Sequence, residues 1–262
     1  HAAGWQSEVH RQQWRSTLTT YAFPVVGEKP TGEIGTEDVL AVLRPIWMEK
    51  PETASRVRGR VEAVLNYAGS MGWRQGDNPA RWRGHLSNLL LARGKVRKVQ
   101  HHPALPWQDI GAFMAALRKR DSVGARALEF LILTAARTSE VIGARWSEIN
   151  LKAAVWIVPA GRMKMRREHR VPLSVPALAV LHELVPLQKL DGEGYVFPGQ
   201  KPGEPLSDMA MLKVLERMER ADLTVHGFRS TFRTWVGEAT ATPNDVAEAA
   251  LAHINGDKVE AA

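Results

Sequence analysis

The sequence predicts a mainly α fold with a small antiparallel sheet, divided into two domains. Three observations support this prediction. Apolar residues recur at helical spacing along most of the 262-residue chain. The short segments rich in β-branched residues lie close together, between residues 155 and 173. A basic, weakly periodic stretch at 93–107 separates two helical parts, and we interpret it as a linker.

The first domain is expected over residues 1–98, including its basic linker. The sequence predicts three helices in it. One covers 36–47, with Thr36 as N-cap and acidic residues in its first turn. The strongest covers 51–72, between Pro51 and Gly72. Its apolar stripe comprises Val57, Val61, Val64, Leu65 and Met71, and Arg56, Arg58 and Arg60 lie off the stripe. A third helix is expected over 82–92.

The second domain, expected over residues 99–262, mixes helices with two strands. Helices are predicted over 107–120 and 125–136, the second apolar enough to be buried. Arg137 precedes another, short helix. The strands are Val155–Val158 and Arg170–Leu173, joined by a basic turn that contains Gly161, Arg162, Lys164, Arg166 and Arg167. Further helices are predicted over 174–185, over 208–218 and from His226 onward.

The composition excludes several classes of protein and favours an anionic partner. The chain has no cysteine, which excludes disulfides, thiolate zinc sites and a cysteine nucleophile. No apolar run approaches the roughly 18 residues of a membrane helix. The net charge of +7 is concentrated in residues 51–100, which hold ten basic and three acidic residues. Such a focus favours a polyanion, although a solvated basic face is the alternative.

Two groups of residues in the second domain are candidates for chemistry. Arg137 follows an apolar run, where a cation needs a partner, and Glu140 stands three residues further on a helix. A plain structural salt bridge is the alternative. Lys164 lies in a turn crowded with like charges, which an anion such as a DNA backbone would neutralise. An exposed hydrophilic hairpin would explain the same turn.

Two histidines and a second arginine near the end of the chain are further candidates. His226 and Arg229 share one face of a helix start, with Thr224 as a possible N-cap. A guanidinium suits phosphate oxygens, and an imidazole can move a proton near neutral pH. A capped helix with polar surface residues is the alternative here. His253 stands alone, and such a histidine is more often a packed core residue. The sequence has no HExxH motif, so we predict no metal site.

Taken in chain order, Arg137 with Glu140, Lys164 in a strand–turn–strand, His226-x-x-Arg229 and then His253 resemble the tyrosine recombinases. The branch that is most similar is the phage integrases of prophages and genomic islands. The stretches RPIWMEKPETASRVRGRVEAVLNYA and NPARWRGHL resemble that branch's core-DNA-binding domain. The stretches GRMKMRREHRVPLS and ALAHINGDKVEAA resemble its catalytic domain.

The resemblance implies a site-specific DNA recombinase that cuts and rejoins DNA through a 3′-phosphotyrosyl intermediate. Arg137 and Arg229 would hold the phosphate, Lys164 would protonate the leaving oxygen, and His226 would assist proton transfer. His253 would bond the phosphate, and Glu140 would support Arg137. No cofactor is implied. The implied partner is a double-stranded DNA attachment site, bound by a homotetramer on paired sites, with possible DNA-bending and excision accessory proteins and no membrane. The implied location is the bacterial cytoplasm, at the nucleoid. We expect DNA contacts from Arg56, Arg60, Lys95, Arg97, Lys98, Arg162 and Arg166.

The chain departs from this family at both ends. The nucleophilic tyrosine would follow the last histidine by about nine or ten residues, and Ala262 is nine residues after His253. We therefore expect the tyrosine just after Ala262, or replaced by it, and expect this chain to bind DNA without cleaving it. The start, with His1 in place of Met, suggests truncation there as well. Two alternatives stay open: a non-catalytic DNA-binding protein on a decayed recombinase fold, and a relaxing topoisomerase of similar chemistry.

Overall fold

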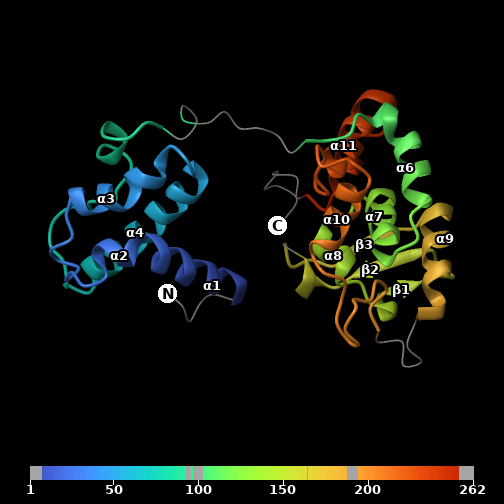
Figure 1. Ribbon diagram of the computed structural model, residues 1–262, viewed down its shortest axis with the longest axis horizontal. Helices are drawn as coiled ribbons and strands as arrows, with labels where there is room; N and C mark the ends of the chain where they lie inside the picture. The colour runs from blue at the N-terminus through green and yellow to red at the C-terminus, as the bar shows by residue number, and fades with distance from the viewer. Residues whose placement is uncertain (1–7, 93–95, 97–102, 164, 188–193, 254–262) are drawn as a thin grey trace. The chain divides into compact units, whose positions relative to one another are not determined.

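The computed structural model describes residues 8–92, 96, 103–163, 165–187 and 194–253, and Figure 1 draws the remaining residues in grey. The chain divides into two compact units, His1–Gln100 and His101–Ala262. Each unit has its own hydrophobic core. The predicted linker at 93–107 falls largely outside the described residues. Among the helices that the model describes, none is both long enough and apolar enough to cross a membrane.

The first unit is entirely helical in its described part (Figure 1). Its elements are α1 (Glu8–Thr17), the π-helical turn η2 (Leu18–Ala22), α2 (Phe23–Val26), α3 (Thr36–Trp47), α4 (Pro51–Ser70) and the 3₁₀ turn η3 (Leu86–Asn88). Leu40 and Leu43 of α3 pack with Val57 and Leu65 of α4 in its core. These buried positions recur at helical spacing, which is why α3 and α4 face each other.

Three expectations for this unit are wrong. The N-cap of α3 is Gly35, whose N–H donates to Asp38 Oδ2 at 3.0 Å; Thr36 is already helical and bonds His85 Nε2 instead, at 2.9 Å. Val64 and Met71 lie outside the core, being 42% and 49% exposed. Residues 82–92 form only the turn η3, since Trp47 stacks on Trp82 and donates to the Leu91 carbonyl, and these tertiary contacts fix an irregular path.

The side chain of Arg60 lies inside this unit. It is 7% exposed, donates to the carbonyl oxygen of Gln13 at 2.6 Å and to Thr17 Oγ1, and stacks over Trp14 at 5.5 Å. Burial lowers its pKa. Its donors are therefore used to fasten α1 to α4, and the expectation that Arg60 contacts DNA is corrected. Arg56, one turn earlier on α4, is exposed and stays a candidate.

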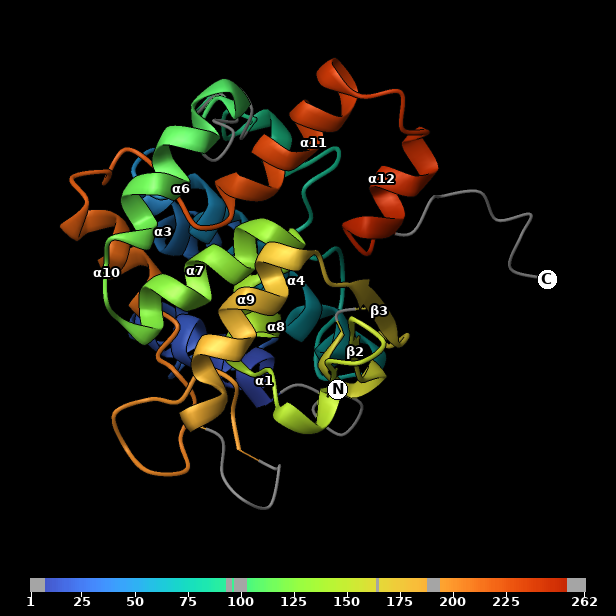
Figure 2. The same cartoon turned by 90° about the vertical axis from the view of Figure 1, so that its right-hand side faces the viewer.

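The second unit places helices around a three-stranded sheet. Its helices are α6 (Ile110–Arg118), α7 (Val123–Thr134), α8 (Thr138–Ile142), α9 (Val175–Leu184), α10 (Ala210–Arg217), α11 (Gly227–Ala239) and α12 (Asn244–Ala250), with 3₁₀ turns η4 (Trp107–Asp109), η5 (Trp146–Glu148), η6 (Ala160–Arg162) and η7 (Val185–Leu187). The apolar helix α7 lies in the middle of the unit and contacts α6, α8, α9, α10 and α11 (Figure 2). Its Phe130 packs against Trp156 and Phe197.

The sheet has the antiparallel order β1 (Ile149–Asn150), β2 (Val155–Val158), β3 (His169–Pro172). The strands β2 and β3 were predicted, β3 one residue too late. The two-residue strand β1 was not, because it is too short to carry an alternating pattern. Along β2 the residues Trp156 and Val158 are buried, and Val158 pairs with His169 of β3. The sheet thus covers one side of the core and carries the basic hairpin at its end.

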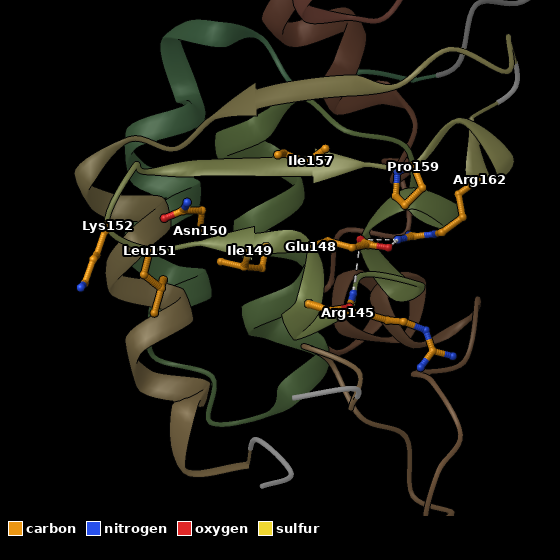
Figure 3. Close-up of a pocket in the computed structure, with 10 residues that line it drawn as sticks. Arg145, Glu148, Ile149, Asn150, Leu151, Lys152, Ile157, Pro159 and Arg162 are labelled. Carbon is orange, nitrogen blue, oxygen red and sulfur yellow. Dashed lines mark hydrogen bonds and ion pairs between the residues drawn. The ribbon is translucent and has the colours of Figure 1, made fainter. Parts of the chain in front are cut away.

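The side chain of Arg162 is also internal, at the end of η6. It donates from Nη1 to both carboxylate oxygens of Glu148 (Figure 3). Its Nη2 donates to the carbonyl oxygen of Glu140. Glu148 is buried below the sheet, with 7% of its side chain exposed. The expectation that Arg162 contacts DNA is therefore corrected, since a buried carboxylate already neutralises it. Arg166 in the same hairpin is exposed, and Lys164 lies outside the described residues.

Candidate active site

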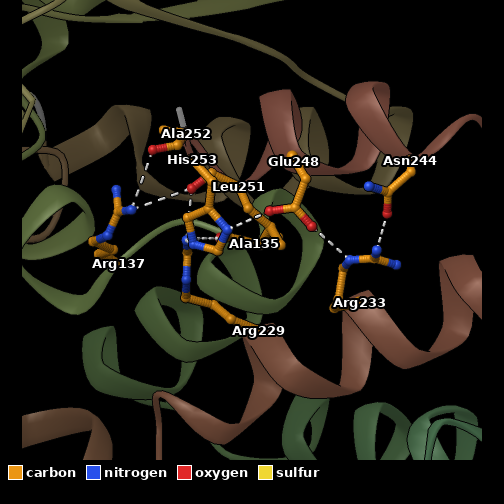
Figure 4. A network of polar contacts seen from close by, with 9 residues as sticks. All are labelled: Ala135, Arg137, Arg229, Arg233, Asn244, Glu248, Leu251, Ala252 and His253. Carbon is orange, nitrogen blue, oxygen red and sulfur yellow. Dashed lines mark hydrogen bonds and ion pairs between the residues drawn. The ribbon is translucent and has the colours of Figure 1, made fainter. Parts of the chain in front are cut away.

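Two arginines from distant parts of the chain meet at the end of α12 (Figure 4). Arg229 of α11 donates from Nη2 to the carbonyl oxygen of Leu251 at 2.6 Å. Arg137, just before α8, donates from Nη2 to the same oxygen at 3.3 Å and to the Ala252 carbonyl at 3.4 Å. The last carbonyls of a helix lack partners within the helix, and cations are favoured there. The two guanidinium groups therefore converge at a point set by α12.

Glu140 holds Arg137 in two ways. Its Oε1 accepts from Arg137 Nη1 at 2.7 Å, and its Oε2 accepts from the Arg137 backbone N–H at 2.8 Å. The second bond closes a capping box at the start of α8, where a free N–H needs an acceptor. Glu140 is 3% exposed. The contact predicted from the i, i+3 spacing is confirmed by this geometry.

Arg229 is more deeply buried than Arg137. It is 5% exposed, and its Nη1 donates to the carbonyl oxygen of Ala135, which follows α7 in a left-handed conformation with φ of 50°. Burial lowers the pKa of Arg229 to about 10, and the neighbouring charge of Arg137 acts in the same direction. Arg229 therefore stays protonated at neutral pH. Glu140 pairs with Arg137, whereas Arg229 donates to the carbonyl oxygens of Ala135 and Leu251, so the positive charge of Arg229 remains available to an anion.

Both predicted histidines lie beside Arg229. A cavity of about 230 Å³ is lined by His226, Arg229, Ser230, Arg233, Thr234, Leu251 and His253. His226 is exposed and is itself the N-cap of α11, so the predicted N-cap Thr224 is wrong; Thr224 Oγ1 accepts from the Gly227 N–H at 3.0 Å in the turn before the helix. The Nε2 atom of His253 lies 3.4 Å from Arg229 Nη2.

The surroundings of His253 rule out its reading as a packed core residue. Its side chain is 47% exposed, and its Nδ1 lies 2.7 Å from Glu248 Oε2. Glu248 also accepts from Arg233 Nε at 2.7 Å. The hydrogen bonds from His253 and Arg233 lower the pKa of Glu248. A carboxylate on Nδ1 fixes the ring so that Nε2 faces the cavity.

His169 of β3 is a member of this cluster that the sequence analysis missed. Its imidazole is half-buried and donates a hydrogen bond to the carbonyl of Ala250. Burial lowers its pKa; Arg137 and Arg229 act in the same direction, against the Glu140 carboxylate. Strand alternation was the available signal, because His169 shares its face of β3 with the buried Val171.

The structure brings most of the predicted catalytic residues together. Glu140, Arg137, Arg229, His226 and His253 lie together around the end of α12, whereas Lys164, Lys95, Arg97 and Lys98 lie outside the described residues. Within the described part of the chain, no group of three or more His, Asp or Glu side chains is placed to hold a metal ion.

Comparison with known proteins assigns the chain to a family. The model of the phage integrase central domain matches residues 1–85, and the model of the phage integrase family matches residues 104–261. The chain belongs to the phage integrase family. It is 36% identical over 253 residues to the prophage integrase IntZ of Escherichia coli K12, covering 96% of this chain and 60% of that protein. It is 30% identical over 276 residues to the integrase of Enterobacteria phage P4, covering 98% of this chain and 60% of the relative. The chain thus spans about 60% of these relatives' length.

Solved structures share the fold at low sequence identity. A lambda integrase (75–356) dimer bound to a COC′ core site superposes with a TM-score of 0.73 at 17% identity, covering 97% of this chain and 91% of that one. The Tn1549 transposon integrase in complex with a circular intermediate DNA gives a TM-score of 0.74 at 14% identity, covering 96% and 88%. The helical fold with a small antiparallel sheet is that of these integrases.

Proposed function

We propose that this chain is the core-binding and catalytic part of a site-specific DNA recombinase that works through a 3′-phosphotyrosyl intermediate. One observation carries the proposal: Arg137 and Arg229 converge on the carbonyl oxygen of Leu251, and Glu140 pairs with Arg137. Such an excess of positive charge favours a phosphate diester. Each guanidinium has five N–H donors, so donors remain for phosphate oxygens beside the bonds to α12.

The reaction would proceed by attack of a tyrosine hydroxyl on the DNA phosphorus. A phosphorus–tyrosine oxygen bond forms, the bond to the 5′ oxygen breaks, and that oxygen leaves as a hydroxyl. Arg137 and Arg229 would stabilise charge on the non-bridging oxygens. Lys164 would protonate the leaving oxygen, and His226 would take the tyrosine proton. His253, beside Arg229, would bond a phosphate oxygen. The phosphotyrosyl bond keeps its energy for rejoining.

The partner in this proposal is a double-stranded DNA attachment site, bound by a homotetramer on paired sites. One solved relative is a lambda integrase tetramer bound to a Holliday junction. The excess of basic residues in 51–100 supports DNA contact by the first unit, with Arg56, Lys95, Arg97 and Lys98 as ligands and Arg166 contributing from the hairpin. DNA-bending and excision accessory proteins, and action at the bacterial nucleoid, would follow from this role.

Covalent trapping tests the proposal. The full-length protein that contains this chain would be incubated with nicked attachment-site DNA in EDTA and denatured in SDS. We expect a protein–DNA adduct that the Arg229→Gln variant does not form, while the 262-residue chain binds the same DNA without forming one. Tight binding with no adduct from the full-length protein would instead identify a non-catalytic DNA-binding protein.

A further inference from the structure

The ion pair of Glu148 and Arg162, beside the residues of the candidate active site, is held by several hydrogen bonds. Besides the bonds from Arg162, Glu148 Oε2 accepts from Trp156 Nε1 at 3.0 Å. The Glu148 side chain is 7% exposed and that of Arg162 is 25% exposed. Breaking a buried pair by removing one partner is costly, because it leaves an uncompensated charge. The position of Arg162 is therefore strongly determined.

The other end of the Arg162 guanidinium reaches the helix that carries Glu140. Its Nη2 donates to the Glu140 carbonyl oxygen. The helix α8 has five residues, so its last carbonyls depend on partners outside the helix. The carboxylate of the same Glu140 holds Arg137. A chain of contacts thus runs from Glu148 through Arg162 and Glu140 to Arg137.

Gly143, at the C-terminal end of α8, provides the space for this contact. A Cβ atom there would lie 2.9 Å from Arg162 Nη2 and 3.3 Å from Arg162 Cζ. Its φ of −88° suits any residue, so glycine is required by space and not by backbone conformation. The nearest obstacle is the far end of a flexible side chain, and the backbone oxygen of Ser139 lies slightly farther away, at 3.1 Å. An alanine at 143 would therefore displace the guanidinium before it disturbed the backbone.

We propose that Arg162 and Glu148 form a positioning pair for DNA cleavage, an inference that rests on the proposed function. Arg162 fixes α8, and with it Arg137, to the base of the β2–β3 hairpin. Lys164 follows Arg162 by two residues in the sequence. The pair therefore holds the phosphate-binding Arg137 in place through α8 and Glu140. Arg162 acts through Glu140 and the hairpin. Because Glu148 neutralises the charge of Arg162, Arg162 adds little to DNA affinity.

The test separates DNA binding from cleavage in the full-length protein. The Gly143→Ala and Arg162→Lys variants are expected to keep the wild-type dissociation constant for attachment-site DNA and its salt dependence. Their single-turnover cleavage at saturating DNA should fall by at least ~10-fold, because misplacement by about 1 Å can cost 100-fold. The contrasting variant is Arg166→Gln, which should weaken DNA binding and lower the salt slope by about one.

Two results would overturn the inference. One is loss of affinity with a flatter salt slope in Arg162→Lys, which would make Arg162 a DNA ligand. The other is wild-type cleavage by both variants. If the wild-type protein forms no adduct at all, the proposed function fails, and hydrogen exchange then decides the structural claim. Residues 137–143 should exchange faster in Gly143→Ala than in the wild type, and equal rates would refute the pair's hold on α8.

Discussion

The Nη2 atom of Arg229 lies 2.6 Å from the carbonyl oxygen of Leu251, across 22 residues of sequence. This bond makes the end of α12 part of the candidate active site. In the proposed function one guanidinium would serve two purposes, since it anchors a helix and would supply positive charge for a phosphate. Variants at this position should therefore change both stability and cleavage.

Replacing Arg229 by lysine should separate charge from geometry. Lysine keeps the cation but cannot reach the carbonyls of Ala135 and Leu251 with a planar fork. We expect single-turnover cleavage to fall by about 100- to 1000-fold, as for loss of a positioned donor. Thermal unfolding should show a lower Tm. The matched control is Arg217→Lys on the exposed side of α10, and wild-type cleavage by Arg229→Lys would contradict the assignment.

The Glu140→Gln variant should destabilise the second unit. The amide keeps its shape but leaves Arg137, whose side chain is 20% exposed, without a charge partner. We expect a loss of about 1–3 kcal/mol in the free energy of unfolding, because Arg137 is largely shielded from water and loses its buried charge partner. Urea unfolding measures this. The exposed pair of Lys213 and Glu216 supplies the control: Glu216→Gln should cost under about 1 kcal/mol, and equal costs would count against the burial argument.

His169 should make stability depend on pH below neutrality. Its pKa in the folded protein is lowered from 6.5, so the unfolded chain takes up the proton first as the pH falls. The stability that this histidine contributes is present above pH 6.5 and is lost as the pH falls through its lower folded pKa. Comparing unfolding at pH 7.5 and 5.5, we expect His169→Gln to lose less stability than the wild type. The same loss in both proteins would exclude His169 as the cause.

The start of α11 should not tolerate a side chain at Gly227. A Cβ there would lie 2.2 Å from the backbone oxygen of Pro103, which cannot move aside as a side chain can. Gly237, later in the same helix, is exposed, and its nearest neighbour is a flexible Arg233 atom at 3.5 Å. We expect Gly227→Ala to lower the Tm by several degrees and Gly237→Ala to raise it slightly. A stable Gly227→Ala protein would mean that residues 103–104 can shift.

The basic stretch before residue 100 should contribute to DNA affinity through phosphates. The double variant Lys95→Ala/Lys98→Ala should bind DNA more weakly at low salt, with a log–log salt slope smaller by about two. Lys29→Ala is a fitting control, because Lys29 is paired with Asp38. If the double variant and the control have the same slope, the stretch lies outside the interface.

Local spacing was enough to predict part of this site. Arg137 and Glu140 are three residues apart, so helical geometry alone brings them into contact. Arg162 and Glu148 are 14 residues apart and meet only because the hairpin folds back on η5. Sequence periodicity carries no information about such a contact. From the sequence, Arg162 and Arg60 are therefore interpreted as surface cations. In the structure, the buried carboxylate of Glu148 lies beside Arg162, and α1 packs against Arg60.

The left-handed residue Ala135 has a consequence for evolution and design. A non-glycine residue in this conformation costs about 1–2 kcal/mol, and here it turns the carbonyl that Arg229 binds. Glycine at 135 would relieve the strain in the native state and loosen the unfolded chain, so its net effect on melting is small. It would also give the backbone more conformational freedom at the junction between α7 and Arg137. Selection for thermal stability alone therefore acts only weakly on this position, whereas an activity that depends on the placement of Arg229 would be directly sensitive to it.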